Sequence, residues 1–154
     1  MNKELFGVST NLSEDLAGIL PDGLPAYLEA NRERLEQSPR PFSDYVRRKL
    51  REKGIPQQNL FLAADLSENY GYKLISEEKR TINRDIPLRM CIVGRFTLDE
   101  TQEALILYGM APLHPRLPRD LVFITAIMNR ICDIHEVNEL LIRCSQRPLL
   151  KNTA

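Results

Sequence analysis

The stretch that decides the fold runs from residue 57 to residue 75 and reads QQNLFLAADLSENYGYKLI. Its apolar residues recur at helical spacing on both sides of a short break at Asp65-Leu66-Ser67. Ser67 is a favourable N-cap, because its hydroxyl can accept from an unpaired backbone N–H of the helix that follows. The stretch therefore predicts two short helices joined by a tight turn.

Three further helices are predicted around this pair. Apolar residues at helical spacing predict a helix from residue 42 that ends at Gly54, a residue suited to a left-handed C-cap. Two helices are predicted after the pair, near 84–94 and 98–108. The second opens with Thr97-Leu98-Asp99-Glu100, a capping box in which the Thr and Glu side chains satisfy each other's backbone N–H groups. With 7 glycines and no tryptophan, the composition also favours an all-α fold.

The C-terminal part repeats the last pair of helices. LDETQEALI at 98–106 aligns with IHEVNELLI at 134–142, and Pro112-Leu113 matches Pro148-Leu149 at the same offset of 36 residues. Arg84-Asp85 and Arg119-Asp120 open the preceding helix of each copy. We interpret this as two copies of one helical hairpin, 84–113 and 119–149, since stacked helix pairs recur with such periods. Chance similarity between amphipathic helices is the alternative.

Proline and charge divide the chain. Pro39 and Pro41 break any helix that precedes them, and short helices are predicted before them near 13–20 and over 24–37. We therefore predict an N-terminal helical appendage over 1–41, a five-helix domain over 42–113, and a C-terminal helical hairpin over 114–154 packed on that domain.

The 154 residues carry 21 basic and 21 acidic side chains, so the formal net charge is zero. Residues 1–41 hold 4 basic and 7 acidic side chains, residues 42–84 hold 9 and 6, and residues 85–154 hold 8 and 8. The balance excludes a basic or an acidic tail as the main functional feature. The positive excess lies in residues 42–84, the segment that contains the predicted helix pair, and the local field rather than the total charge governs an encounter with DNA.

Length and cysteine usage indicate a cytoplasmic protein without a membrane partner. No apolar run approaches the ~20 residues that span a bilayer, and the start lacks the regions of a signal peptide. The three cysteines are widely spaced, which is typical of free thiols in a reducing compartment.

Catalytic and metal-binding patterns find little support, so we predict no enzyme, no cofactor and no metal site. The sequence holds two histidines and no nucleophile or phosphate-loop motif. Cys132, His135 and Cys144 are three potential zinc ligands, but a structural site needs a fourth. The repeat places Cys132 and Cys144 where Phe96 and Tyr108 stand, so core packing is predicted for both.

The helix pair has the proportions of a helix-turn-helix, whose second helix lies in the DNA major groove. Residues 68–76 are then the recognition helix, where an Asn can pair with adenine and a Lys can reach guanine or phosphate. Ordinary solvated polar residues on a helical bundle are the alternative interpretation. The candidate DNA-binding residues are Gln57, Gln58, Ser67, Glu68, Asn69, Tyr70, Lys73, Lys79, Arg80 and Arg84.

The chain from about residue 24 to 150 resembles the Xre-type (λ-repressor-like) helix-turn-helix proteins of Firmicutes, in a subgroup with an appended helical hairpin. The resemblance implies a λ-repressor-like five-helix domain and a DNA-binding transcriptional regulator. It rests on the order and spacing of many short motifs. These include Tyr27-Leu28-Glu29, Pro41-Phe42-Ser43-Asp44-Tyr45, Lys53-Gly54-Ile55, Tyr70-Gly71-Tyr72, Arg84-Asp85, Leu98-Asp99-Glu100-Thr101-Gln102, Pro115-Arg116, Arg119-Asp120 and Val137-Asn138-Glu139-Leu140-Leu141.

The chain departs from the family where DNA would be read. Glu68 stands where relatives usually carry a basic residue, and Glu77 and Glu78 are added at the exit of the recognition helix. Phe61 and Leu62 are apolar where relatives are more often polar, and at least one is expected on the DNA side. An exposed apolar residue there indicates a protein partner.

Two functions from different classes follow. The first is a sequence-specific regulator that binds double-stranded DNA, with its outer hairpin serving as a homodimer interface or effector sensor. The second is a protein-interaction module, an adaptor or inhibitor in a bacterial or phage system, on a scaffold that has lost DNA reading.

Overall fold

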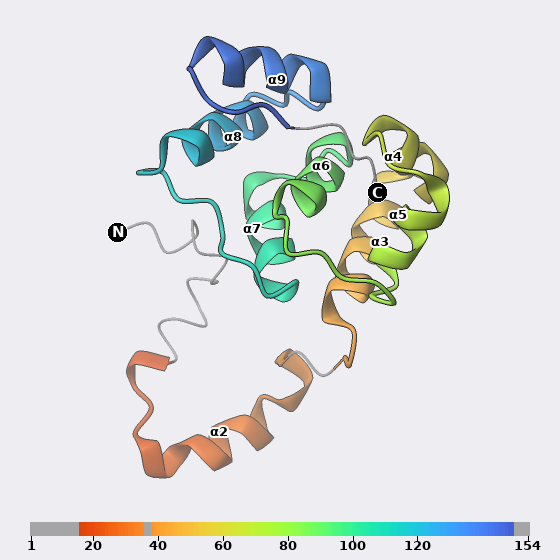
Figure 1. The fold of residues 1–154 in the computed structure, drawn as a ribbon. Helices are drawn as coiled ribbons and strands as arrows, with labels where there is room; N and C mark the ends of the chain where they lie inside the picture. Colours follow the sequence, from red (N-terminus) through yellow and green to blue (C-terminus); the bar gives the residue numbers. More distant parts are fainter. Residues whose placement is uncertain (1–15, 36–37, 150–154) are drawn as a thin grey trace.

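The computed structural model describes residues 16–35 and 38–149, and these residues are helical with no strand among them (Figure 1). The predicted helix near 13–20 lies partly outside the described residues. The α-helices within them are α2 (Leu24–Ala30), α3 (Pro41–Lys53), α4 (Gln57–Ala63), α5 (Glu68–Ile75), α6 (Asp85–Val93), α7 (Leu98–Leu107), α8 (Pro118–Met128) and α9 (Ile134–Arg143). Two 3-10 turns, Pro21–Gly23 and Arg32–Arg34, flank α2. The predicted all-α class is confirmed.

Local sequence signals fix the helix ends. Gly54 ends α3 in the left-handed conformation with φ 68°, as its position predicts. The predicted capping box is present at α7, where Thr97 Oγ1 accepts from the Glu100 N–H at 3.2 Å and Glu100 Oε1 accepts from the Thr97 N–H at 2.9 Å. Asp133 caps α9 in the equivalent way by accepting from the Glu136 N–H at 3.0 Å.

Two hydrophobic clusters meet at α6 and α7, the central helices of Figure 1. The first cluster joins α3, α4 and α5 to one side of α6 and α7, around Phe42, Phe61 and Tyr108. The second joins the other side of the same two helices to α8 and α9, around Leu88 and Phe123. The central pair is therefore covered on both sides, which explains why eight consecutive residues of α6, 85–92, are buried.

The two hairpins, α6–α7 and α8–α9, repeat the same polar contacts at the predicted offset. Gln102 donates to the Leu113 carbonyl at 2.8 Å and accepts from the Leu113 N–H at 2.7 Å. Asn138 makes the same pair of bonds to Leu149, at 3.2 and 2.7 Å. Each hairpin thus ties the chain that follows its second helix back onto that helix by one buried or half-buried amide.

A reciprocal pair of ion pairs joins the two hairpins. Arg84 pairs with Asp120, and Arg119 donates to both carboxylate oxygens of Asp85 at 2.8 and 2.9 Å. Each arginine also donates to the carbonyls of the segment after its own hairpin: Arg84 to residues 111 and 112, and Arg119 to residues 147 and 148. The Arg-Asp dipeptide that marks the start of each copy is therefore the link between the copies.

The cysteines correct one prediction from the repeat. Phe96 and Tyr108 are buried, but Cys132 and Cys144 are exposed. Cys132 is the extra residue by which the second inter-helix turn is longer, so its neighbour Ile131 takes the place of Phe96. Cys144 does occupy the position of Tyr108, but the described chain places no helix over it, whereas α3 covers Tyr108.

The part of the appendage over 16–35 stands apart from the helical body in Figure 1. It is less regular than predicted over 24–37, since α2 ends at Ala30 and the 3-10 turn Arg32–Arg34 follows. None of the helices in the described part of the chain is both long enough and apolar enough to cross a bilayer.

Candidate nucleic-acid interface

The turn between α4 and α5 is built from the backbone outward. Asp65 adopts φ 59°, and the next residue, Leu66, donates its N–H to the Phe61 carbonyl at 2.9 Å. Ser67 then caps α5, its Oγ accepting from the Tyr70 N–H at 3.2 Å. This is the helix stop, left-handed residue and N-cap that a two-helix corner requires.

A glycine sets how closely α4 and α5 approach. A Cβ placed on Gly71 would lie 2.4 Å from Cδ1 of Phe61, a distance that no unstrained structure tolerates. The Phe61 ring fills that space, is 1% exposed, and meets the Tyr72 ring edge-on at 4.9 Å between centroids. Phe61 is therefore a core residue, and its assignment as an interaction residue was wrong.

The turn between α4 and α5 is also supported by a buried arginine of α6, which the sequence analysis did not predict. Arg89 of α6 is 1% exposed and donates from Nη1 to the Ala64 carbonyl at 3.2 Å. Burial lowers the pKa of this guanidinium from its ordinary value, while the charges of Asp65 and Asp85 act in the opposite direction. The only sequence signal is a lone charge inside the apolar run of residues 86–93, which periodicity does not mark as a partner of the turn.

The N-terminal ends of α4 and α5 lie together. Gln58 Nε2 donates to Glu68 Oε1 at 2.7 Å, which joins the first turn of one helix to the first residue of the other. Asn69 is exposed beside them, Lys73 is half-buried one turn further along α5, and Gln57 is half-buried at the start of α4. These polar residues are thus at least partly exposed at the N-terminal half of the helix pair.

The acidic residues at the exit of α5 point in different directions. The Glu77 side chain is 10% exposed, and its Oε2 accepts from the Ser43 N–H at the start of α3, at 3.4 Å. It supplies an acceptor there because Arg40, the N-cap residue of α3, makes no capping bond with its side chain. Glu78 is exposed, so of these two acids it is the one whose charge can repel DNA bound at α5.

The basic residues of the following loop are only partly free for DNA. Lys79 is exposed, with its Nζ 5.6 Å from the centroid of the Tyr70 ring. Arg80 pairs with Glu77 at 3.2 Å, donates to the Tyr108 carbonyl and lies 4.3 Å over the Tyr108 ring. Arg84 is held between the hairpins by Asp120. Its expected contact with a DNA backbone is therefore corrected to a structural role, because its guanidinium is already occupied.

Leu62 is the apolar residue that this surface does expose. It lies on α4 and is 83% exposed, while its neighbour Phe61 is buried. One of the two predicted apolar residues is thus on the outside.

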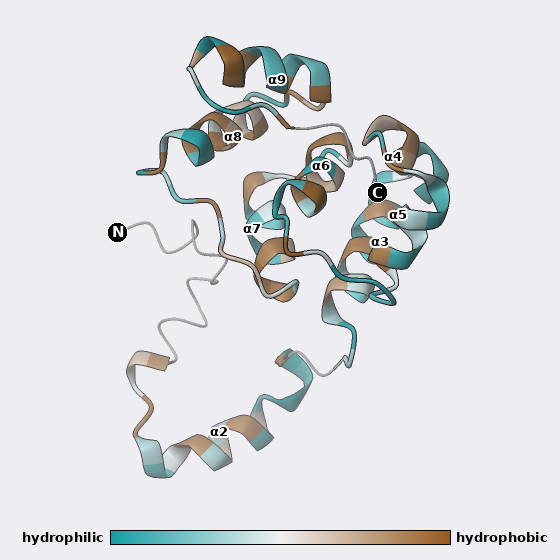
Figure 2. Ribbon diagram, in the orientation of Figure 1, coloured by the Kyte–Doolittle hydropathy of each residue, from teal (hydrophilic) through white to brown (hydrophobic). Residues whose placement is uncertain are grey.

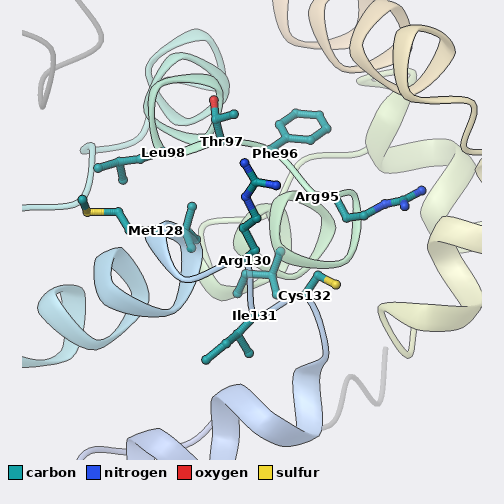
Figure 3. Close-up of a pocket in the computed structure, with 10 residues that line it drawn as sticks. Arg95, Phe96, Thr97, Leu98, Met128, Arg130, Ile131 and Cys132 are labelled. Atoms are coloured by element: carbon teal, nitrogen blue, oxygen red, sulfur yellow. The ribbon is translucent and has the colours of Figure 1, made fainter.

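A cavity of about 360 Å³ lies where the inter-helix turns of the two hairpins meet. Figure 3 shows Arg130 of one turn extending toward Phe96 and Thr97 of the other, while Arg95 points away. Arg95 and Arg130 both have φ 57°, so the two turns are conformational equivalents. No cluster of three or more potential metal ligands occurs in the described part of the chain.

Comparison with known proteins gives no relative: no family model, no curated protein and no solved structure matches the chain.

Proposed function

We propose that the chain is a sequence-specific DNA-binding transcriptional regulator of the helix-turn-helix type, with α5 as its recognition helix. One observation carries the proposal: α4 and α5 bring Gln58, Glu68 and Asn69 together on one exposed surface at the two helix N-termini. Such ends suit a DNA backbone, and the first residues of a recognition helix reach base edges. The resemblance to Xre-type proteins points the same way.

The direction of Glu77 also favours DNA. Of the three acids that the sequence places at the recognition helix and its exit, Glu77 turns inward onto α3. Glu68 is held by Gln58 and remains able to accept from a cytosine amino group. Glu78 is left as the acid whose removal should strengthen binding.

Binding is expected to depend weakly on salt. The charges of Lys73 and Lys79 are matched in number by those of Glu68 and Glu78 on α5 and its exit, and Arg80 and Arg84 have intramolecular partners. A protein that neutralises few phosphates has a shallow salt slope and a low non-specific affinity.

The test measures the dissociation constant on a duplex enriched from a random pool. Asn69→Ala should weaken binding about 5- to 150-fold, the value of one bidentate base contact. Arg130→Gln, which removes an exposed charge from the other hairpin, should leave the affinity unchanged. Equal affinities for wild-type protein and Asn69→Ala would overturn α5 as the reading element.

A matched pair of acids tests the electrostatics. Glu78→Gln should raise affinity for DNA at low salt, because it removes a repulsive exposed charge. Glu77→Gln should instead lower stability with little effect on affinity, since its carboxylate serves the start of α3. The reverse pattern would contradict the orientation of these two side chains.

The 83% exposure of Leu62 favours a second candidate, a protein-interaction module that uses the same surface. In that case a partner protein binds the wild-type chain, and Leu62→Glu abolishes the complex while helix content and melting temperature stay unchanged. A complex that survives Leu62→Glu would rule out this surface.

A further inference from the structure

The two hairpins face each other through equivalent residues. In the second hydrophobic cluster, Leu88 and Ile92 of α6 lie with Phe123 and Ile127 of α8, which are their counterparts 35 residues later. Leu105 and Leu141, counterparts 36 residues apart, lie in the same cluster. The ion pairs are reciprocal in the same way, because Arg84 pairs with Asp120 and Arg119 pairs with Asp85. The two hairpins are therefore related by a local two-fold axis.

That relation predicts an equivalent outer face on each hairpin, and on the first hairpin this face is covered by α3. Tyr108 is 2% exposed and meets Phe42 of α3 edge-on at 4.7 Å between ring centroids. Met90 and Ala104 are buried in the same cluster. An amphipathic helix therefore occupies the outer face of α6–α7.

The counterparts on the second hairpin line an uncovered groove of about 320 Å³. Thr125, Leu140 and Cys144 replace Met90, Ala104 and Tyr108, and all three line it. Its lining is completed by Pro118, Leu121, Val122 and Gln146. Within the described part of the chain no helix covers these residues, and Leu121, the counterpart of the buried Ile86, is 47% exposed.

Within the described residues, the same chain exposes a leucine at every fourth position before α3, a spacing that makes one apolar stripe when the segment is continuously helical. The exposed fractions are 48% for Leu16, 75% for Leu20, 42% for Leu24 and 48% for Leu28, and the last two lie on α2. Figure 2 shows these hydrophobic segments around α2, away from the helical body. We call residues 16–35 the arm.

We propose that the groove between α8 and α9 binds the arm of a second copy of this chain, so that two copies exchange arms in a reciprocal dimer. The arm would lie on the second hairpin as α3 lies on the first. A reciprocal exchange buries both unpartnered surfaces and closes the assembly at two copies.

Charge and position favour the second copy over the same chain. Asp22 and Glu29 lie among the leucines of the arm, while the exposed Arg143 and Arg147 adjoin the groove residues Cys144 and Gln146. In Figure 1 the arm and the α8–α9 hairpin lie at opposite ends of the molecule. The proposal is independent of DNA binding, since neither surface includes α4 or α5.

The test compares self-association of the full chain and two defective variants by analytical ultracentrifugation. Wild-type protein should be a dimer. The arm variant Leu24→Glu/Leu28→Glu and the groove variant Leu121→Glu should each weaken the dimer by about tenfold or more, because a charge enters an apolar contact. Ile82→Glu, at an apolar residue that is 101% exposed elsewhere, is the matched control and should have no effect.

Mixing the two defective variants distinguishes the arrangement. The groove variant keeps its arm and the arm variant keeps its groove, so the mixture should form mixed dimers through one intact contact. A monomeric wild-type protein would overturn the proposal. So would a dimer that responds to Leu121→Glu but not to the arm substitutions, which would mean that groove packs on groove. Circular dichroism of each variant shows whether it folds.

A disulfide trap provides a second readout that does not depend on weakening the fold. In a Cys132→Ser background, Leu28→Cys should form an intermolecular disulfide with the native thiol of Cys144 when diamide takes up the two electrons and two protons released. Cys91 is buried and does not compete. The control Glu33→Cys, off the leucine stripe, should cross-link much more slowly; equal rates would contradict the packing of the leucines on the groove.

Discussion

At the scale of single residues, the contact between Gly71 and Phe61 determines the geometry of the candidate interface. The phenyl ring lies where any β-carbon at position 71 would stand, so α5 approaches α4 over a glycine. The exposed side of α5 and the position of Leu62 both follow from this contact, because it turns Phe61 inward.

Replacing Gly71 by Ala is expected to lower the free energy of unfolding by about 1–3 kcal/mol, the usual cost of overpacking a core. The matched control is Gly23→Ala, where no atom lies within 4 Å of the added methyl group. Urea denaturation of both variants measures the difference. Equal stabilities would mean that the ring of Phe61 does not occupy this space.

The sequence predicts some of these residues and misses others for a physical reason. Ser67 as an N-cap follows from local spacing, whereas the departure from Xre-type proteins predicts only that at least one of Phe61 and Leu62 is exposed. The inward turn of Glu77 does not, because it depends on the start of α3, 34 residues away. The burial of Arg89 depends in the same way on a carbonyl 25 residues earlier in the chain.

At the scale of helices, the hairpin repeat explains most of the C-terminal half. The alignment of 98–106 with 134–142 places Gln102 and Asn138 at one structural position, and Asp133 caps α9 at the position that matches the predicted cap Thr97. Sequence comparison could not predict that the Arg-Asp pairs cross between the hairpins, because that depends on how the two copies face each other. It also predicted wrongly that Cys144 is buried. The repeat gives Cys144 the position of Tyr108, but it does not provide a second copy of α3 to cover it.

Removing the repeated amide should cost more in the first hairpin than in the second. Gln102 is fully buried and its loss leaves two backbone groups of Leu113 without partners, so Gln102→Ala should destabilise by about 1–3 kcal/mol. Asn138 is half-buried and water can replace it, so Asn138→Ala should have a smaller effect. Thermal unfolding measures the loss of stability in both variants. A larger loss in Asn138→Ala than in Gln102→Ala would contradict this order.

Glu100 gives the fold a specific acid sensitivity. Burial opposes ionisation of this carboxylate, but bonds from Lys53, the Thr97 N–H and Lys49 outweigh it, and the pKa of Glu100 lies below its ordinary value of 4.5. A depressed pKa contributes stability above the unfolded value and loses it as the pH falls through the folded value. The stability advantage of wild-type protein over Glu100→Gln should therefore shrink as the pH falls below about 4.5.

The control for this pH dependence is Glu136→Gln, at the equivalent position of the second hairpin. Glu136 is exposed and has no lysine partner among the described residues. Urea denaturation of Glu136→Gln across the same pH range supplies the comparison. A parallel pH dependence for both variants would contradict the role of the two lysines.

At the scale of the whole molecule, α6 and α7 lie between two hydrophobic clusters and contribute side chains to both. Deleting residues 117–154 should expose Leu88, Ile92 and Leu105 and cause aggregation, measured by light scattering at micromolar concentration. A soluble truncation with cooperative unfolding would show that the first five-helix unit does not need the second hairpin.

The charge of the whole chain does not show which basic side chains are available to DNA, because several are paired inside the molecule. The positive excess of residues 42–84 includes Lys49 and Lys53, which bind Glu100, as well as Arg80 and Arg84 with partners inside the molecule. The helix pair itself, residues 57–75, carries one basic side chain, Lys73. A DNA-binding function must therefore rest on base contacts more than on phosphate attraction.

The most direct test of that account is selection of random-sequence duplexes at low salt by wild-type protein and by Asn69→Ala in parallel. Wild-type protein should enrich one motif, and Asn69→Ala should lose preference at a position of that motif, since the amide pairs with one base. A pool that stays unenriched by wild-type protein would contradict DNA reading by this helix pair.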